Sequence, residues 1–401
     1  MRRVAITGLG AVCALGNNVS EMWAALEAGR SGIGPIASVD TTSLRFKNGA
    51  EARAFQAEQH FPGSSVDYLD RFAQFAVVAA REALDHSKLK ITPELSARTA
   101  VVMGAGIGGQ STQDVGFVDL YGNKRNRVNP LTIPKTMANA GTSQICMDRG
   151  LTGPAMTVST ACSSANHAIG QAFWWLRSGV VDAAVAGGSE SPFSFGLLKA
   201  WEAMRVIAPD TCRPFSKGRA GMVLGEGAGV LVLEAMDAAQ ARGAKIYGEI
   251  VGFGMSADAH HLTQPSVQGP AQAMRMALAD AGITPEQVGY INAHGTGTLA
   301  NDVTEAKAVH AVFGERRVPV SSTKSMHGHA LGAAGALEAV ATAMALEKGV
   351  LPPTANFTEL DPECGDIDVI VEARKAQAEY AMSNSFAFGG LNAVVVFKRS
   401  G

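Results

Sequence analysis

"TVSTACSSANHAIG" (residues 157–170) aligns without a gap to "PVSSTKSMHGHALG" (residues 319–332), at a constant offset of 162 residues. In each copy, an apolar run that ends in hydroxyl residues leads into a segment rich in small residues. The pattern predicts the same strand–turn–helix unit twice, and a duplicated chain is its simplest explanation.

Both predicted helices are unusually poor in charge. "SSANHAIGQA" (163–172) and "GHALGAAGALEA" (328–339) consist mainly of Ala, Gly and Ser, whereas a helix exposed on one side carries a charged face. We therefore expect both helices to be buried between two sheets, in a fold with more layers than a three-layer doubly wound domain.

The rest of the chain supports an α/β fold. Its 401 residues are 47% hydrophobic and 17% charged, enough to bury a large core. Short apolar runs such as "TAVVMGAG" and "NAVVVFK" alternate with longer helical patterns. The segment "MDAAQARGAKI" (236–246) ends like a helix, with basic residues and a glycine, so we place the boundary between two halves at 1–245 and 246–401.

Bulk properties disfavour several classes of partner. A formal net charge of −2 gives no overall positive field for nucleic acid or an anionic membrane. The five cysteines form neither a CxxC pair nor a Cys/His ligand spacing, which argues against a disulfide framework or a metal site and favours the reducing cytoplasm. No apolar run reaches the ~18 residues of a membrane span.

Cys162 is the first candidate for chemistry. It follows a predicted strand and starts a helix, where free N–H groups and the helix dipole favour a thiolate. Cysteine also occurs often as a small core residue, and this alternative stays open from the residues alone. His167 is a poor base for the thiol, because five helical residues turn it about 140° away.

Further candidates lie in the second half. "NAHGTGT" (292–298) places His294 after an apolar strand, and Thr296 and Thr298 can either bind an extended ligand or cap the turn. Lys324 aligns with Cys162, and a buried lysine would need an acid such as Glu338. A cysteine thiol together with two histidine imidazoles indicates chemistry on acyl groups.

A glycine-rich motif in the first half is a weaker candidate. "GAGIGG" (104–109) matches the GxGxxG pattern of dinucleotide-binding proteins, but we predict neither the helix nor the acidic residue that such a site requires.

Five motifs together resemble the β-ketoacyl-[acyl carrier protein] synthases, the condensing enzymes of fatty-acid and polyketide assembly. They are "VAITGLGAV", "TACSS", "NAHGT", "KSMHGHALGAAGALE" and "SNSFAFGGLNAVVVF", in the order of that family and over nearly the whole chain. The resemblance implies a thiolase-like, duplicated five-layer αβαβα fold. It also implies a dimer, either of identical chains or with a chain-length-factor-like paralogue, and substrates carried on the phosphopantetheine of an acyl carrier protein, with no other cofactor and no metal.

The resemblance also implies roles for individual residues. Cys162 would carry the acyl chain, while His294 and His329 would bind the malonyl thioester and stabilise the enolate formed by loss of CO2. Lys324, paired with Glu338, would support them, and the N–H groups of Cys162 and Phe388 would form an oxyanion hole, with Phe388 also acting as a gate. The remaining roles are pantetheine contact by Thr296 and Thr298, the acyl pocket at Ile107, and carrier-protein docking by Lys124, Arg125, Arg127 and Arg205.

Several positions depart from the family pattern. His327 stands where threonine is usual, Ala387 replaces a glycine of the gate, and Leu391 replaces a threonine or histidine. These departures leave open whether the pathway is housekeeping fatty-acid synthesis or a specialised polyketide, polyene or nodulation-type one. Two other functions fit the sequence less well. A non-catalytic chain-length factor is disfavoured by the cysteine and both histidines, and a coenzyme A thiolase by the lack of a late cysteine in a CxG turn.

Overall fold

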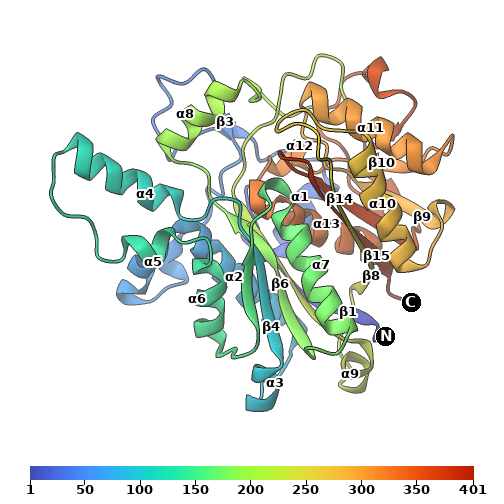
Figure 1. Cartoon of the computed structure of the whole chain (residues 1–401), viewed down its shortest axis with the longest axis horizontal. Helices are drawn as coiled ribbons and strands as arrows, with labels where there is room; N and C mark the ends of the chain where they lie inside the picture. The colour runs from blue at the N-terminus through green and yellow to red at the C-terminus, as the bar shows by residue number, and fades with distance from the viewer.

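The computed structural model of the chain describes residues 1–63 and 65–401. Eleven strands form one hydrogen-bonded sheet in the order β12-β10-β9-β14-β15-β8-β1-β7-β6-β4-β5 (Figure 1). Their bounds are β1 Val4–Cys13, β4 Thr99–Gly104, β5 Ala155–Val158, β6 Ala183–Glu190, β7 Gly227–Ala235, β8 Gly248–Ala257, β9 Val288–Asn292, β10 Pro319–Ser321, β12 Asp368–Val369, β14 Tyr380–Phe386 and β15 Leu391–Arg399.

The strand order is symmetric about the junction of β1 and β8. The first half reads β5-β4-β6-β7-β1 and the second reads β10-β9-β14-β15-β8. In each half, the three outer strands are parallel and the next two pairings are antiparallel. The halves join where Val4–Ile6 pair with Gly248–Ile250. The duplication predicted from the repeat is therefore present in the strand topology.

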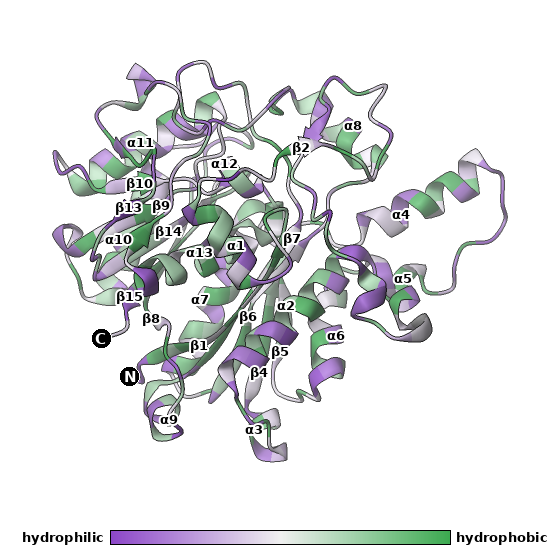
Figure 2. Cartoon of the chain, turned by 180° about the vertical axis from the view of Figure 1, so that it is seen from behind, coloured by the Kyte–Doolittle hydropathy of each residue, from purple (hydrophilic) through white to green (hydrophobic). Residues whose placement is uncertain are grey.

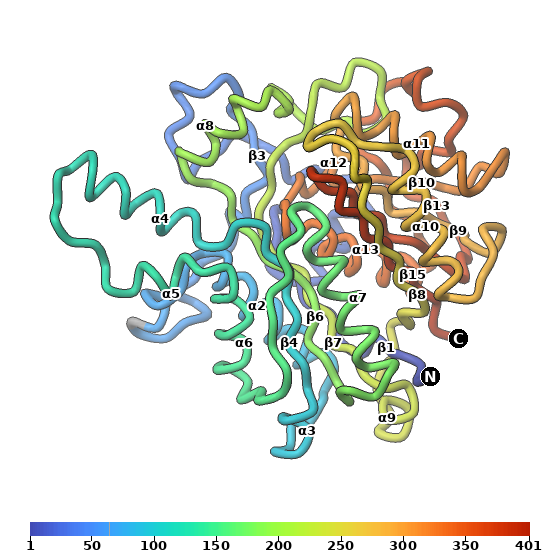
Figure 3. The backbone as a smooth tube through the Cα atoms, in the orientation of Figure 1, coloured from blue at the N-terminus to red at the C-terminus, as the bar shows by residue number. Residues whose placement is uncertain are grey.

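Helices cover the outer side of each half-sheet and also fill the space between the two half-sheets. Helices α2 (Arg71–Ser87) and α6 (Ala140–Arg149) lie on the outer side of the first half-sheet, and α10 (Gln268–Ala281) and α11 (Leu299–Phe313) on that of the second. Helices α7 (Ser164–Arg177) and α13 (Ala334–Lys348) pack between the two (Figures 1 and 3). This is the predicted five-layer αβαβα arrangement.

The middle layer explains the wealth of small residues. Every residue of α13 from 334 to 346 is buried, and Figure 2 shows hydrophobic colouring along the strands around it. The approach is so close that a Cβ on Gly104 would lie 2.4 Å from the Ala165 nitrogen, and one on Gly229 would lie 2.5 Å from the carbonyl carbon of Ala336. Glycine is therefore required on the strands that face these helices.

The register of the repeat differs from the ungapped alignment. Helix α7 begins at Ser164 and α13 at Ala334, an offset of 170 residues, eight more than the 162 of the ungapped alignment. The short turns that precede them also correspond, since Ala161 (φ 51°) and Leu331 (φ 46°) are both left-handed. The counterpart of Cys162 is therefore Gly332, and the alignment of Lys324 with Cys162 is wrong. The extra eight residues form α12 (Lys324–His327) and the turn that carries His329.

The remaining elements decorate this core. An arm of α4 (Gln110–Phe117), η3 (Val118–Gly122) and α5 (Thr132–Thr136) projects from the first half, and α8 (Phe195–Met204) caps it (Figure 1). The division at residues 245 and 246 falls between α9 (Met236–Ala241) and β8 and stays a prediction. Among the described residues, we find no helix that combines the length and the apolar composition needed to cross a bilayer. Other short elements are α1 Val19–Glu27, α3 Pro93–Ala97, β2 Gly34–Pro35, β3 Asn48–Gly49, β11 Val350–Leu351 and β13 Arg374–Lys375.

Candidate active site

Three reactive side chains converge from three separate segments. Cys162 lies in the turn η4 (Ala161–Ser163) that starts α7, His294 follows β9, and His329 follows α12. The Cys162 Sγ atom and a ring nitrogen of each histidine all lie within 4.8 Å of one another. All three residues are buried, and all line one pocket. The fold thus brings together residues that are more than 130 positions apart.

The thiol of Cys162 is protonated in this closed site. Burial raises its pKa to about 11, although the charge of Lys324 and the N–H groups of Phe388 and of Cys162 itself act in the opposite direction. The prediction that the helix start lowers the thiol pKa is therefore wrong for this conformation, because the loss of solvation outweighs the helix terminus.

His329 presents an N–H to the pocket. Its Nδ1 accepts the backbone N–H of Leu331 at 3.3 Å, while its Nε2 is buried without a hydrogen-bond partner among the residues that the structure describes. Burial, with the charge of Lys324, lowers its pKa well below 6.5. The ring is therefore neutral, and because Nδ1 is an acceptor, the proton lies on Nε2.

His294 has the same tautomer for a different reason. The Lys324 ammonium lies 3.3 Å from its Nδ1, so this nitrogen accepts, and burial together with Lys324 lowers the pKa of the ring well below 6.5. The rings of His294 and His329 are 5.4 Å apart and nearly perpendicular, at 85°. Two neutral N–H donors therefore face the thiol. The same trio has a spacing that suits a metal ion, but the fixed charge of Lys324 opposes a cation there.

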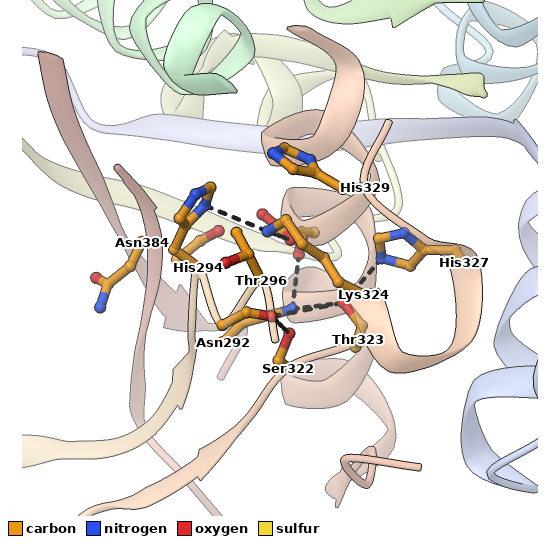
Figure 4. Close-up of polar contacts among 12 residues, drawn as sticks. Asn292, His294, Thr296, Ser322, Thr323, Lys324, His327, His329 and Asn384 are labelled. Carbon is orange, nitrogen blue, oxygen red and sulfur yellow. Dashed lines mark hydrogen bonds and ion pairs between the residues drawn. The ribbon is translucent and has the colours of Figure 1, made fainter. Parts of the chain in front are cut away.

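Lys324 and Glu338 form an ion pair in which both side chains are fully buried. Figure 4 shows the Lys324 ammonium joined to the ring of His294, and the same ammonium donates a hydrogen bond to the Glu338 carboxylate of α13. Burial has the larger effect on the Glu338 carboxyl and raises its pKa, although the neighbouring Lys324 ammonium acts in the opposite direction. The pair fixes a positive charge behind the histidines and explains why one acidic residue stands in the apolar sequence of α13.

Thr296 and Thr298 serve the turn and also line the pocket. Their hydroxyls lie 2.9 Å apart, and Thr298 accepts the N–H of Asn301 to cap α11. Both residues line the pocket with Cys162 and the two histidines. Turn capping and ligand contact, the two alternatives left open above, are therefore compatible.

Phe388 separates the thiol from an apolar cluster. It follows β14, its N–H contacts Cys162, and its ring stacks on Trp201 of α8, with centroids 6.2 Å apart and planes at 27°. Gly389 and Gly390 follow with φ of 84° and 71°. Ile107 does not line the pocket; it packs with Trp201 in the cluster behind the Phe388 ring.

The four basic residues assigned to docking do not line the pocket either. Lys124, Arg125 and Arg127 are exposed on the arm between η3 and α5, and Arg125 pairs with Asp119. Arg205 is exposed at the end of α8. His167 makes hydrogen bonds to Thr160 and to the Ser163 carbonyl, as expected for a structural histidine.

Two buried carboxylates escaped the sequence analysis. Glu190, at the end of β6, accepts four backbone N–H bonds from Gly106, Ile107, Gly108 and Gly332, and burial raises its pKa to about 7. Glu305 of α11 accepts the N–H groups of His294 and Gly295 at 2.8 and 2.7 Å. An acid at the end of an apolar strand, as in "AVAGGSE", is the only signal of this role in the sequence.

Comparisons with known proteins agree with one another. The family described as "Beta-ketoacyl synthase, N-terminal domain" matches residues 1–239, and the corresponding C-terminal domain matches residues 247–358. The chain is 47% identical to nodulation protein E of Rhizobium sp. (strain N33), over 99% of both chains. It is 41% identical to 3-oxoacyl-[acyl-carrier-protein] synthase 2 of Staphylococcus aureus (strain COL), over 99% of this chain and 98% of that one. A solved structure, "The ishigamide ketosynthase/chain length factor", superimposes with a TM-score of 0.96 at 37% identity and covers both chains fully.

Proposed function

The chain belongs to the β-ketoacyl synthase family, and from that premise we propose that Cys162, His294 and His329 carry out acyl transfer and decarboxylative condensation on substrates held by an acyl carrier protein. One observation carries the proposal: a thiol and two neutral N–H donors share a single pocket within 4.8 Å. Acyl transfer needs the first, and formation of an enolate needs the second.

In the first half-reaction, the Cys162 sulfur attacks the carbonyl carbon of the incoming acyl thioester. The N–H groups of Cys162 and Phe388 point at the sulfur, so they are the donors for the oxygen that becomes negative. The thiol proton leaves with the departing pantetheine thiol, and the acyl group stays on Cys162 as a thioester. Because the thiol is protonated at rest, we expect its proton to be lost only as the substrate enters.

In the second half-reaction, the carbonyl oxygen of a malonyl thioester accepts the Nε2–H bonds of His294 and His329. The carboxylate leaves as CO2, and its electron pair forms an enolate whose oxygen the same two donors stabilise. The enolate carbon then attacks the acyl carbon on Cys162, a C–C bond forms and the thiolate departs. Lys324 keeps His294 in the donating tautomer, and Glu338 balances its charge.

The pocket walls define the expected path of the substrate. Thr296 and Thr298 offer hydroxyls to the amide groups of the pantetheine arm. The acyl chain extends past Phe388, a gate residue that stacks on Trp201 and is followed by Gly389 and Gly390, toward Ile107 and its apolar neighbours. The arm delivers both substrates, so no separate cofactor is required.

Four exposed basic residues are our candidates for docking the acidic surface of the carrier protein. They are Lys124, Arg125, Arg127 and Arg205. These charges are solvent-exposed, and only Arg125 forms an ion pair in the described part of the chain. All five cysteines are free thiols, consistent with a cytoplasmic location.

We propose that the chain works as a dimer through the exposed side of the first half. Strand β5 lies at the edge of the sheet, and the unpaired backbone N–H and C=O groups of such an edge can bind another chain. Exposed apolar side chains surround it on the arm, α6 and β5: Val115, Phe117, Val118, Tyr121, Ile133, Met137, Met147 and Met156. The second subunit is an identical chain or a chain-length-factor-like paralogue.

The pathway is a specialised one in our proposal. The 47% identity to nodulation protein E of Rhizobium sp. (strain N33) exceeds the 41% identity to 3-oxoacyl-[acyl-carrier-protein] synthase 2 of Staphylococcus aureus (strain COL), and His327, Ala387 and Leu391 depart from the family pattern around the site. Fatty-acyl, unsaturated or polyketide chains all remain candidates for the acyl substrate.

Mass spectrometry of the intact protein tests the function. After incubation with acyl carrier protein loaded with saturated, unsaturated or polyenoyl chains, we expect one acyl adduct on Cys162 and none on the Cys162→Ala variant. Cys13→Ala, at a buried thiol that does not line the pocket, is the matched control and should acylate like the parent. An adduct on another residue, or none with any chain, would refute the assignment.

A further inference from the structure

The buried imidazole of His327 has no part in the reaction described above. It is fully buried at the end of α12, two residues before His329 and three after Lys324. Its two ring nitrogens each meet one partner. Nδ1 lies 2.8 Å from the Gly328 carbonyl oxygen, and Nε2 lies 3.0 Å from the Thr323 hydroxyl.

These contacts fix every proton of the group. A carbonyl oxygen only accepts, so Nδ1 carries the hydrogen and Nε2 accepts the hydroxyl hydrogen of Thr323. Burial and the charge of Lys324 lower the pKa of His327 to about 3, so the ring stays neutral. The Thr323 oxygen is then free to accept from Asn292, whose amide nitrogen lies 3.5 Å away. Figure 4 shows the chain of contacts from His327 through Thr323 to Asn292.

The two ends of this chain carry the two working histidines. Gly328 is the residue before His329, and its carbonyl belongs to the peptide group that sets the direction of the His329 backbone. Asn292 is the last residue of β9, two residues before His294, and its amide also reaches the Glu338 carbonyl at 3.4 Å. The contacts therefore connect the turn inserted in the second half to the strand beside it.

The turn needs such a connection. Gly328 has φ of 69°, and the insertion has no counterpart before α7, so the repeated scaffold alone does not fix its shape. Backbone bonds from His329 to Val223 and from Gly225 to His329, at 2.7 and 2.9 Å, fix its other side. His327 supplies the fixed point on the side that faces β9.

We propose that His327 is a positioning residue, which sets the separation of the His294 and His329 donors by linking the Gly328 carbonyl to the Thr323 hydroxyl. The inference rests on the proposed function. It predicts a defect confined to the step that uses both donors. Malonyl decarboxylation should slow, while acyl transfer to Cys162, which uses the backbone N–H groups, should not.

Three variants separate the contacts. His327→Leu removes both, Thr323→Val removes the hydroxyl alone, and His327→Asn keeps an N–H near the Nδ1 position. We expect kcat for decarboxylation of a malonyl-loaded bacterial acyl carrier protein to fall by about 10- to 100-fold in His327→Leu, the scale of a small misplacement of catalytic groups, with KM unchanged. His327→Asn should recover part of the loss. The double variant His327→Leu/Thr323→Val should be no worse than His327→Leu, because both changes break one link.

The controls separate this proposal from a general loss of structure and from failure of the proposed function. Thr99→Val also removes a buried threonine hydroxyl, bonded to Leu95 far from the site, and should leave both steps unchanged. If decarboxylation persists in all folded variants, or if acyl transfer falls equally, His327 is not a positioning residue. The imidazole ¹⁵N signals of His329 provide a readout without turnover. They should shift in His327→Asn and Thr323→Val, and unchanged signals overturn the proposal even if the parent chain proves inactive.

Discussion

Replacing His329 by alanine removes one of the two N–H donors that face the Cys162 thiol. The structure defines what is lost: the Nε2 of His329 is buried without a partner among the described residues, and a ring nitrogen of His329 lies within 4.8 Å of the Cys162 sulfur. One preorganised donor to a developing oxyanion is worth about 3 to 4 kcal/mol. We therefore expect decarboxylation of malonyl carrier protein to slow by about 10²- to 10³-fold.

The loss should be confined to one half-reaction. In the proposed mechanism, acyl transfer uses the N–H groups of Cys162 and Phe388, which the substitution leaves in place, so acylation of Cys162 should proceed at the parental rate. His329→Gln returns an N–H to the end of a side chain of similar reach, and should recover about tenfold of the loss. Mass spectrometry measures both steps, as conversion of malonyl to acetyl carrier protein and as the acyl adduct on the enzyme.

Two results would refute this reasoning. Decarboxylation at the parental rate in a folded His329→Ala variant would show that Nε2 does not bind the thioester oxygen. An equal loss of acyl transfer and decarboxylation would show that the residue shapes the pocket as a whole. A urea unfolding curve for each variant separates both outcomes from loss of the fold.

Four further predictions concern other parts of the molecule. Burial raises the pKa of Cys162 to about 11, so its alkylation by iodoacetamide should accelerate about tenfold per pH unit up to about pH 10; a plateau near pH 8 contradicts this. The pKa of His327 falls from 6.5 to about 3 on folding. The unfolded chain therefore binds the extra proton below pH 6.5, and His327 should contribute about 2 kcal/mol to the loss of unfolding free energy between pH 7.5 and 5, so that the loss is smaller by this amount in His327→Leu than in the parent. Glu190→Gln leaves one oxygen for four N–H donors and should lower the unfolding free energy by about 2 to 6 kcal/mol, if two donors lose their acceptor; an unchanged urea midpoint opposes it. Trp201→Leu removes the stack on Phe388, worth about 0.5 to 1.5 kcal/mol, and should accelerate acyl transfer by about 2- to 10-fold by freeing the gate; an unchanged rate means that the stack does not hold it closed.

The repeat predicted the layered fold because it reports on packing. Small residues on all sides of a helix have one physical cause, close approach on every side, and the structure places α7 and α13 between the two half-sheets for that reason. The same repeat predicted the wrong register for the helices. The two copies align without a gap in sequence, but in the structure the helix of the second copy begins eight residues later than that alignment places it. Sequence identity at Ser and His positions is too weak a signal to locate such an insertion.

The site was predictable from sequence where a buried charge requires a partner of opposite charge. A lysine and a glutamate that both lie in apolar sequence are expected to pair, and Lys324 does pair with Glu338. Glu190 and Glu305 were missed because their partners are backbone N–H groups, which every residue has and no side-chain pattern reveals. The prediction for the pKa of Cys162 is wrong because the burial of the thiol arises from segments far apart in the sequence, and a local pattern around residue 162 does not reveal it.

The middle layer also bears on how the protein loses activity. Cys162 stands at the first turn of α7, and Glu338 lies within α13, the helices enclosed on both sides. Amide hydrogens in such elements exchange only when the whole molecule opens, whereas peripheral helices such as α3 and α9 can fray alone. The thiol and the carboxylate that pairs with Lys324 are thus anchored in the part of the chain that unfolds last. Heat or denaturant should inactivate the enzyme together with global unfolding, with no earlier stage in which a folded molecule has a disordered catalytic centre.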